Sequence, residues 1–214
     1  RGLGDVYKRQ VLDGVFSHTG SDSRYFNREG RYGEGGAYRD PNSPYRSWYD
    51  FDPKYKGGYR SWWGFETLPE VNEETPSYVE FITGEGGVID TWLRRGAAGF
   101  RLDVSDELPD EFIEKVRTAV KRVGPDKFLL GEVWEDATTK FGFDKRRTYL
   151  LGKGLDSVMN YPFKNAVLGF VCGRDAGQTM TDILSICEHY PAPALDTALN
   201  FLSTHDTCLL YTSP

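Results

Sequence analysis

The chain has 214 residues, a formal net charge of -6, a pI near 5.2 and 39% hydrophobic residues. This composition supplies one sizeable globular core, and it excludes low-complexity disorder. The acidic balance offers no basic surface, so we expect no nucleic-acid partner. No apolar stretch reaches the roughly 18 residues that a membrane helix needs, so we expect no membrane partner. The three cysteines are widely spaced and form no CxxC pair, which favours a reducing, cytoplasmic location.

The two ends of the chain differ from the rest of the pattern. Lys8, Arg9 and Gln10 stand where a buried strand leading into Val11 should be apolar. The C-terminal stretch CLLYTSP stops abruptly after a motif. We therefore expect residues 1–10 and 208–214 to be non-native segments, and residues 11–207 to be a fragment of a longer domain.

Between the ends, short apolar runs alternate with amphipathic segments, as in a parallel sheet with crossover helices. In chain order we predict strands at Val11–Phe16, Ala97–Val104, Lys127–Trp134 and Thr197–Thr204, with a less regular fifth candidate at Leu155–Tyr161. The apolar spacing predicts helices near residues 88–95, 109–124 and 178–187. Residues 19–76 are rich in Gly, Pro, Asn, Tyr and Trp without a sustained period, which predicts a long, ordered, loop-rich excursion.

The stretch GFRLDVSDE, residues 99–107, places charge inside an apolar run. In a strand, Arg101 and Asp103 share one face while Phe100 and Leu102 share the other. An ordinary half-buried strand gives the same alternation with its polar face in water. The pattern by itself leaves both interpretations open.

Polar residues also end the other predicted strands, and in a parallel barrel these carboxyl ends meet at one face. The candidates in chain order are Asp13, His18, Arg101, Asp103, Glu132, His205 and Asp206. Each has a plainer alternative. Asp13 suits a structural brace for Arg101 as well as it suits substrate contact. An isolated Glu132 would suit a loop cap, and the two histidines would suit satisfied core or surface positions.

These residues lie in five short motifs that resemble those of the α-amylase family, glycoside hydrolase family 13, in the family's order. The motifs are DGVFSH (13–18), LPEVN (68–72), GFRLDVSDE (99–107), GEVW (131–134) and FLSTHD (201–206). The flanking stretches RSWWGFETLPEVN and MNYPF are most similar to the neopullulanase, cyclomaltodextrinase and maltogenic amylase branch. The resemblance implies an α/β fold, namely an incomplete TIM (β/α)8 barrel with roughly strands 3 to 7, over about residues 11–207.

The resemblance also implies roles for these residues. Asp103 would be the nucleophile, Glu132 the general acid/base and Asp206 the transition-state stabiliser. The substrate-binding residues would be His18, Arg101 and His205, to which we add Trp134 because an aromatic ring packs well on a pyranose face. Asp13 would give structural support.

The implied function is a retaining α-glycoside hydrolase acting on α-1,4-linked glucans, or on α-1,6 linkages, in maltooligosaccharides, cyclodextrins or pullulan. The alternatives are an oligo-1,6-glucosidase or transglycosylase of the same family, and a non-catalytic barrel relative. A metal-dependent hydrolase usually needs more histidines than the three in this chain. No cofactor is expected, and calcium dependence is doubtful because Ser17 stands where many members have a calcium-binding Asn.

The chemistry accounts for these residue types. Retaining hydrolysis needs a protonated carboxyl at the leaving oxygen and a carboxylate below the anomeric carbon, about 5 to 5.5 Å apart. Arg101, a permanent cation on the same strand face, is expected to keep the pKa of Asp103 low. We expect an unclosed barrel to expose sheet edges, so that these 214 residues alone express poorly or aggregate and are inactive, while the parent protein, a candidate homodimer, is active.

Overall fold

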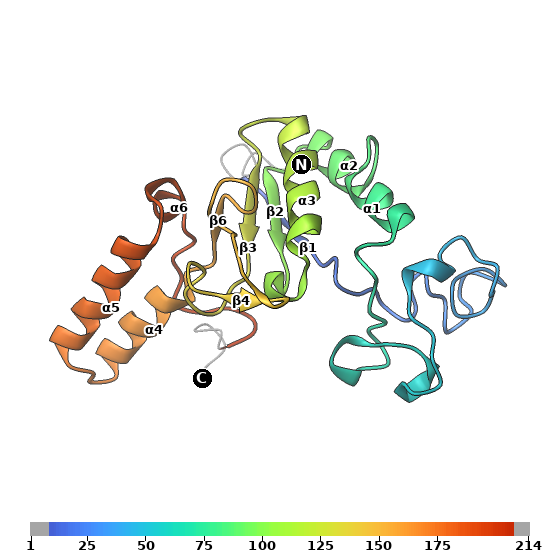
Figure 1. The fold of residues 1–214 in the computed structure, drawn as a ribbon, viewed down its shortest axis with the longest axis horizontal. Helices are drawn as coiled ribbons and strands as arrows, with labels where there is room; N and C mark the ends of the chain where they lie inside the picture. Colours follow the sequence, from blue (N-terminus) through green and yellow to red (C-terminus); the bar gives the residue numbers. More distant parts are fainter. Residues whose placement is uncertain (1–8, 208–214) are drawn as a thin grey trace, which may run out of the picture.

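The computed structural model describes residues 9–207 (Figure 1). The segments predicted to be non-native, 1–10 and 208–214, lie outside the described residues except for Arg9 and Gln10. The central feature is a parallel sheet in the order β1-β2-β3-β6. Its strands are β1 (Val11–Gly14), β2 (Gly99–Leu102), β3 (Phe128–Gly131) and β6 (Ser157–Val158).

Each strand of this sheet pairs in parallel with the sheet strand that follows it in the sequence. Asp13 is level with Arg101, and Arg101 is level with Leu130. In a (β/α)8 barrel each new strand is added at the same edge of the sheet, whereas in a doubly wound sheet the strand order reverses partway through. The order therefore agrees with the predicted incomplete barrel, and it brings the carboxyl ends of the strands to one edge.

Three helices lie toward the β1 side of the sheet in Figure 1, namely α1 (Pro76–Thr83), α2 (Val88–Arg94) and α3 (Asp110–Val123). The stripe of α3 that contains Phe112, Val116 and Val120 is buried, as its 3.6-residue period predicts. The predicted helices near 88–95 and 109–124 are thus confirmed. α1 was not predicted.

Beyond β6 lie α4 (Tyr161–Val171), α5 (Ala176–His189) and α6 (Ala192–Asp196). The helix predicted near 178–187 is confirmed within α5, whereas α4 and α6 were not predicted. Between β3 and β6 a short antiparallel hairpin forms from β4 (Phe141–Gly142) and β5 (Lys145–Arg146). Within residues 9–207, no helix combines the length and the apolar character needed to cross a lipid bilayer.

One strand prediction is wrong. The segment Thr197–Thr204 is irregular and forms only a parallel bridge between Leu199 and Met159. Its ladder consists of the Leu199 N–H donating to Val158 and the Asn160 N–H donating to Leu199. An apolar run becomes a strand only where a neighbour supplies matching N–H and C=O groups over several residues. The less regular candidate at Leu155–Tyr161 does hold a strand, β6.

The excursion over residues 19–76 is ordered, as predicted. Its core is aromatic: Phe26, Trp48 and Tyr59 are buried, and the rings of Phe26 and Tyr59 lie 4.6 Å apart. Its regular structure consists of the short 3₁₀ turns Arg46–Trp48, Lys56–Gly58 and Trp62–Gly64. A β-bridge between His18 and Glu70 returns the excursion to the end of β1. The excursion therefore lies beside the carboxyl end of β1.

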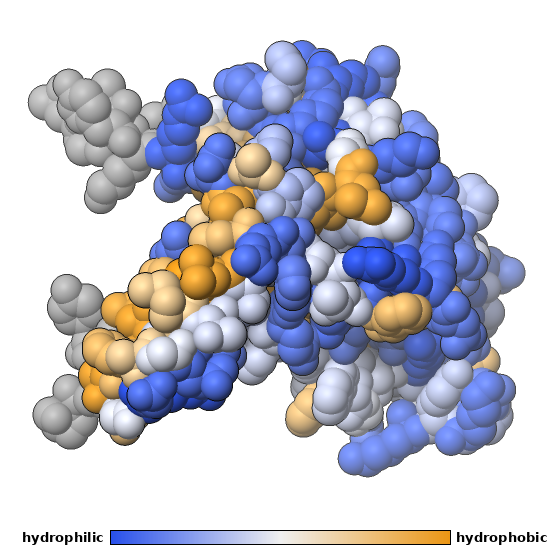
Figure 2. All heavy atoms as spheres, turned by 60° about the vertical axis from the view of Figure 1, so that its left-hand side comes forward, coloured by the Kyte–Doolittle hydropathy of each residue, from blue (hydrophilic) through white to orange (hydrophobic). Residues whose placement is uncertain are grey.

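The surface around α4 and α5 is unusually apolar. Figure 2 shows hydrophobic side chains along this arm, where Phe170, Val171 and Met180 are exposed. Val11 of the edge strand β1 is also exposed. Exposed apolar surface and an open sheet edge are features expected of an unclosed barrel.

Candidate active site

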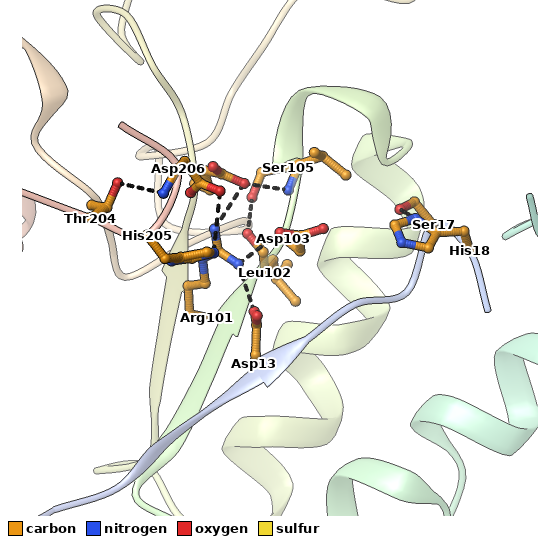
Figure 3. A network of polar contacts seen from close by, with 12 residues as sticks. Asp13, Ser17, His18, Arg101, Leu102, Asp103, Ser105, Thr204, His205 and Asp206 are labelled. Carbon is orange, nitrogen blue, oxygen red and sulfur yellow. Dashed lines mark hydrogen bonds and ion pairs between the residues drawn. The ribbon is translucent and has the colours of Figure 1, made fainter. Parts of the chain in front are cut away.

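Arg101 is the centre of a charged cluster at the carboxyl edge of the sheet (Figure 3). Its Nη1 lies 2.7 Å from Oδ1 of Asp13 and 2.7 Å from Oδ1 of Asp103. Its Nη2 lies 3.0 Å from Oε2 of Glu132. One guanidinium therefore joins carboxylates from the ends of β1, β2 and β3. Because the Arg101 side chain is only 12% exposed, the interpretation that places this face of GFRLDVSDE in water is wrong.

Glu132 is almost completely buried at the end of β3, with 5% of its side chain exposed. Its Oε2 accepts a hydrogen bond from the N–H of Val104 at 2.8 Å, and its Oε1 accepts one from Nε1 of Trp134 at 2.8 Å. Val104 has the left-handed conformation, with φ 41° and ψ 52°. This conformation is rare for a β-branched residue and is kept only where the surroundings enforce it. The turn after Asp103 is thus shaped to present its N–H group to Glu132.

The electrostatic surroundings of Asp103 differ from those predicted. Burial raises the pKa of the Asp103 carboxyl above its ordinary value, and the favourable charge of Arg101 only partly opposes this effect. The like charges of Glu132 and Asp13 raise this pKa further. Arg101 does lower the pKa of Asp103, as predicted, but burial outweighs this effect, so the expectation of a low pKa is wrong.

A cavity of about 540 Å³ opens over this cluster, and Asp103, Glu132 and Asp206 all line it. A volume of this size is typical of ligand pockets. Asp206 belongs to the turn that follows Thr204, and Figure 3 shows it beside the Arg101 cluster. The structure therefore brings the three acidic residues together although they are far apart in the sequence.

The two candidate histidines lie at the margin of this site. Nε2 of His205 is 3.2 Å from Oδ1 of Asp206, and the His205 side chain is 68% exposed. His18 lies apart from the carboxylates in Figure 3 and does not line the cavity. Its ring is 5.3 Å from that of Trp62, which does line it. Burial lowers the pKa of His18, and the charge of Glu107 opposes this effect.

Ser17 is the residue on which the expectation about calcium rests. Ca²⁺ binds six to eight oxygen ligands. Ser17 is buried, and its hydroxyl lies 2.9 Å from the Nδ1 nitrogen of His18. In the described part of the chain, no group of three or more His, Cys, Asp or Glu residues is arranged to hold a metal ion.

Trp134 both lines the cavity and holds Glu132. One face of its indole stacks on Tyr161, with the ring centres 4.7 Å apart and the planes 12° apart. Tyr161 comes from the MNYPF stretch at the start of α4. Trp134 is therefore fixed in orientation, and it remains 46% exposed for contact with a ligand.

A second aromatic wall was not among the predicted site residues. The indole N–H groups of Trp62 and Trp63 donate to the two carboxylate oxygens of Glu107, at 2.7 and 2.9 Å. All three residues line the cavity, and Trp63 is 78% exposed with a left-handed φ of 50°. The paired tryptophans in the excursion were a signal in the sequence. Their shared acceptor, the last residue of GFRLDVSDE, could not be read from it.

Comparison with known proteins places the chain in a family. Residues 8–212 match the family model of the α-amylase catalytic domain. An amylopullulanase from Thermoanaerobacterium saccharolyticum is 34% identical over 233 residues, covering 94% of this chain and 17% of that protein. A cyclomaltodextrinase from a Bacillus species is 32% identical, covering 95% of this chain and 35% of that protein. The chain thus spans well under half the length of either relative.

A solved structure agrees with these matches. The cyclic α-maltosyl-(1→6)-maltose hydrolase from Arthrobacter globiformis superposes with a TM-score of 0.77 at 27% identity, covering 93% of this chain and 42% of that chain. The predicted fold class, an incomplete (β/α)8 barrel, is therefore confirmed, as is the predicted family. The chain belongs to the α-amylase family and forms part of its catalytic domain.

Proposed function

We propose that the protein containing this chain is a retaining α-glycoside hydrolase. The observation that carries the proposal is the convergence of Asp103, Glu132 and Asp206 on one cavity, with Arg101 joining the first two. Retaining hydrolysis uses a close pair of carboxyl groups that flank the scissile bond. A non-catalytic relative would have no need to keep these carboxylates together.

In the proposed reaction, the Asp103 carboxylate attacks the anomeric carbon while Glu132 protonates the leaving oxygen, so that the glycosidic bond breaks and a glycosyl ester forms. Glu132 then takes a proton from water, and the resulting hydroxide displaces Asp103 with overall retention. Asp206 stabilises the positive charge of the oxocarbenium-like transition state.

The remaining residues would bind or support. Trp134 would stack on a sugar ring, and His205 would contact a hydroxyl beside Asp206. His18 would act from the margin of the site, next to Trp62. Asp13 is exposed and braces Arg101, which suits a supporting role. The reaction needs no cofactor, and the cytoplasmic location and the homodimer remain predictions.

For the substrate we propose α-1,4-linked glucans, with α-1,6 linkages as a second target. The names of the relatives, amylopullulanase and cyclomaltodextrinase, support this class. The test is to incubate the full-length gene product with pullulan, β-cyclodextrin and maltooligosaccharides and to separate the products by chromatography. Panose from pullulan would support a neopullulanase, and exclusive α-1,6 cleavage of short substrates would indicate an oligo-1,6-glucosidase. Absence of any new reducing sugar would contradict the proposal.

Replacing Arg101 should affect both the rate and its pH dependence. Arg101→Met removes the cation that opposes the burial of Asp103, so the pKa of Asp103 should rise further. Asp103 must be ionised to attack, so the acid limb of the kcat/KM profile should move to higher pH. We also expect kcat to fall by about 10²-fold or more, because three carboxylates lose their common partner.

Arg101→Lys is the matched control for charge. It keeps the cation but cannot supply the two-pronged geometry. Its acid limb should stay nearer that of the wild type, although kcat should still fall. An Arg101→Met profile with an unchanged acid limb would contradict the electrostatic role assigned to Arg101.

A further inference from the structure

Among the arginines that form ion pairs within residues 9–207, Arg147 is the most deeply buried, with 1% of its side chain exposed. It directly follows β5, and its neighbour Arg146 is exposed. The guanidinium carbon lies 4.5 Å from the centre of the Tyr149 ring and 5.2 Å from that of Phe143. A buried cation is tolerated only where its donors are well paired. The hydrogen-bond partners of Arg147 therefore identify the segment that this buried side chain holds in place.

Those partners belong to the segment that follows Asp103. Nη1 of Arg147 donates to the carbonyl of Asp106 at 2.9 Å, and Nη2 donates to the carbonyl of Leu108 at 2.6 Å. Its Nε donates to Oδ1 of Asp110 at 2.7 Å. All three acceptors lie within the turn after the proposed nucleophile or at the first residue of α3. Arg147 thus fastens this turn to the hairpin of β4 and β5.

Two more side chains of the same region support the attachment. The Tyr149 hydroxyl donates to Oδ1 of Asp106 at 2.7 Å, and Nζ of Lys140 lies 2.8 Å from Oδ2 of Asp106. The turn spans residues 105–108: it is a single 3₁₀ turn, Ser105–Glu107, closed by Leu108, whose N–H donates to the carbonyl of Ser105. Such short turns have poor hydrogen-bond geometry and little stability of their own. External contacts are therefore needed to keep the turn in one conformation.

The turn controls two features of the catalytic cavity. At its start, Val104 has the left-handed conformation that directs its N–H to Glu132. At its end, Glu107 accepts the indole N–H groups of Trp62 and Trp63. Arg147 itself does not line this cavity. Any effect it has on the reaction must pass through the turn.

We infer that Arg147 is a positioning residue, which holds the Ser105–Leu108 turn so that Val104 and Glu107 place Glu132 and the tryptophan wall around the substrate. This inference rests on the proposed glycosidase function for its readout of activity. The dependence of the turn's conformation on Arg147 can be measured separately, without any substrate.

The test compares Arg147→Lys with the wild type in the full-length gene product. A lysine keeps the charge, but its three N–H donors share one nitrogen, so it cannot reach the acceptors that Arg147 binds from Nε, Nη1 and Nη2. We expect kcat on a chromogenic maltoside to fall about 10- to 10²-fold, while KM changes much less, because small misplacements of catalytic groups act on the chemical step. Hydrogen exchange of the backbone amides of residues 104–108 should become faster.

Arg117→Lys is the matched control. Nη1 of Arg117 also donates to a carbonyl, that of Gly154, and to a carboxylate, that of Asp156, but it lies at the other end of the strands. Its kcat and the exchange of residues 104–108 should match the wild type. If Arg147→Lys does not fold, Tyr149→Phe removes only the hydroxyl that binds Asp106 and should show the same changes to a smaller extent.

The outcomes separate the two proposals. An inactive wild type would contradict the glycosidase function, and faster exchange in Arg147→Lys would still support the positioning of the turn. Unchanged exchange of residues 104–108 in a folded Arg147→Lys or Tyr149→Phe variant would overturn the inference. Equal losses of kcat in Arg147→Lys and Arg117→Lys would also overturn it, since they would indicate a general structural effect.

Discussion

The Asp103→Asn variant of the full-length protein is expected to fold normally and to lose activity by at least about 10³-fold in kcat. An amide lacks the negative charge needed to attack the anomeric carbon. The same amide keeps an oxygen that can accept from Nη1 of Arg101, so the cluster should stay assembled. The loss should therefore appear in the rate of hydrolysis of maltooligosaccharides, with near-UV circular dichroism unchanged.

Asp22→Asn is a matched control for the loss of a carboxylate. Asp22 is also paired with an arginine, Arg31, at 2.8 Å, but it lies on the surface and does not line the cavity. We expect its activity to equal that of the wild type.

A second variant, Asp103→Gly, leaves space for azide, which would attack the α-glycoside from the side of the missing carboxylate and give a β-glycosyl azide. An Asp103→Asn enzyme with a tenth or more of the normal kcat would be incompatible with a nucleophilic role.

Replacing Glu132 with glutamine should give a loss that depends on the leaving group. On maltooligosaccharides, whose leaving alkoxide needs a proton, we expect kcat to fall about 10²- to 10⁴-fold. An α-maltosyl fluoride has a leaving group that needs little protonation, so its first step should be much less affected. The comparison of these two substrates by initial rates separates acid catalysis from a general disruption of the site.

The structure adds a secondary expectation for Glu132→Gln. Donors face both oxygens of Glu132, so the amide NH₂ of a glutamine would meet the N–H of either Val104 or Trp134. Glu135→Gln is the control, since Glu135 also lines the cavity and pairs with Lys140 outside the Arg101 cluster. Its kcat should change only slightly. Equal losses on both substrates for Glu132→Gln would contradict the role of general acid.

The parts of the fold that the sequence predicted are those with strong local periodicity. The α3 stripe repeats at the helical period, and its Asp and Glu at the first turn complement the helix dipole. In β2 the strict alternation of apolar and charged residues predicted that Arg101 and Asp103 share a face, and both contact the same cluster.

The parts that were missed depend on tertiary context. Apolar residues fill much of α4, so its sequence lacks a clear polar face, although Asn160 caps it and Pro162 suits its first turn. The run Thr197–Thr204 looked like a strand from its apolar residues, but only Leu199 finds a β partner, Met159, within the described residues. Periodicity cannot tell a strand from an extended segment that pairs with its neighbour at a single residue.

The candidate active site also combines features that the sequence predicts with features that depend on tertiary contacts. The order of the motifs predicted which carboxylates converge, because strand ends of a parallel barrel share one face. The sequence could not tell that Arg147 turns inward while Arg146 stays exposed, or that Glu107 holds two tryptophans. It also could not predict the sign of the Asp103 pKa shift, since burial depends on residues far away in the chain.

The most direct test of the whole account is to identify the residue that becomes bonded to the sugar. A 5-fluoroglycosyl fluoride of the α series slows hydrolysis of a glycosyl ester enough for mass spectrometry of a peptic digest. We expect the added mass on the peptide that contains Asp103, and we expect no added mass in the Asp103→Asn variant. A label on a different carboxylate, or turnover that yields an inverted product without any label, would contradict it.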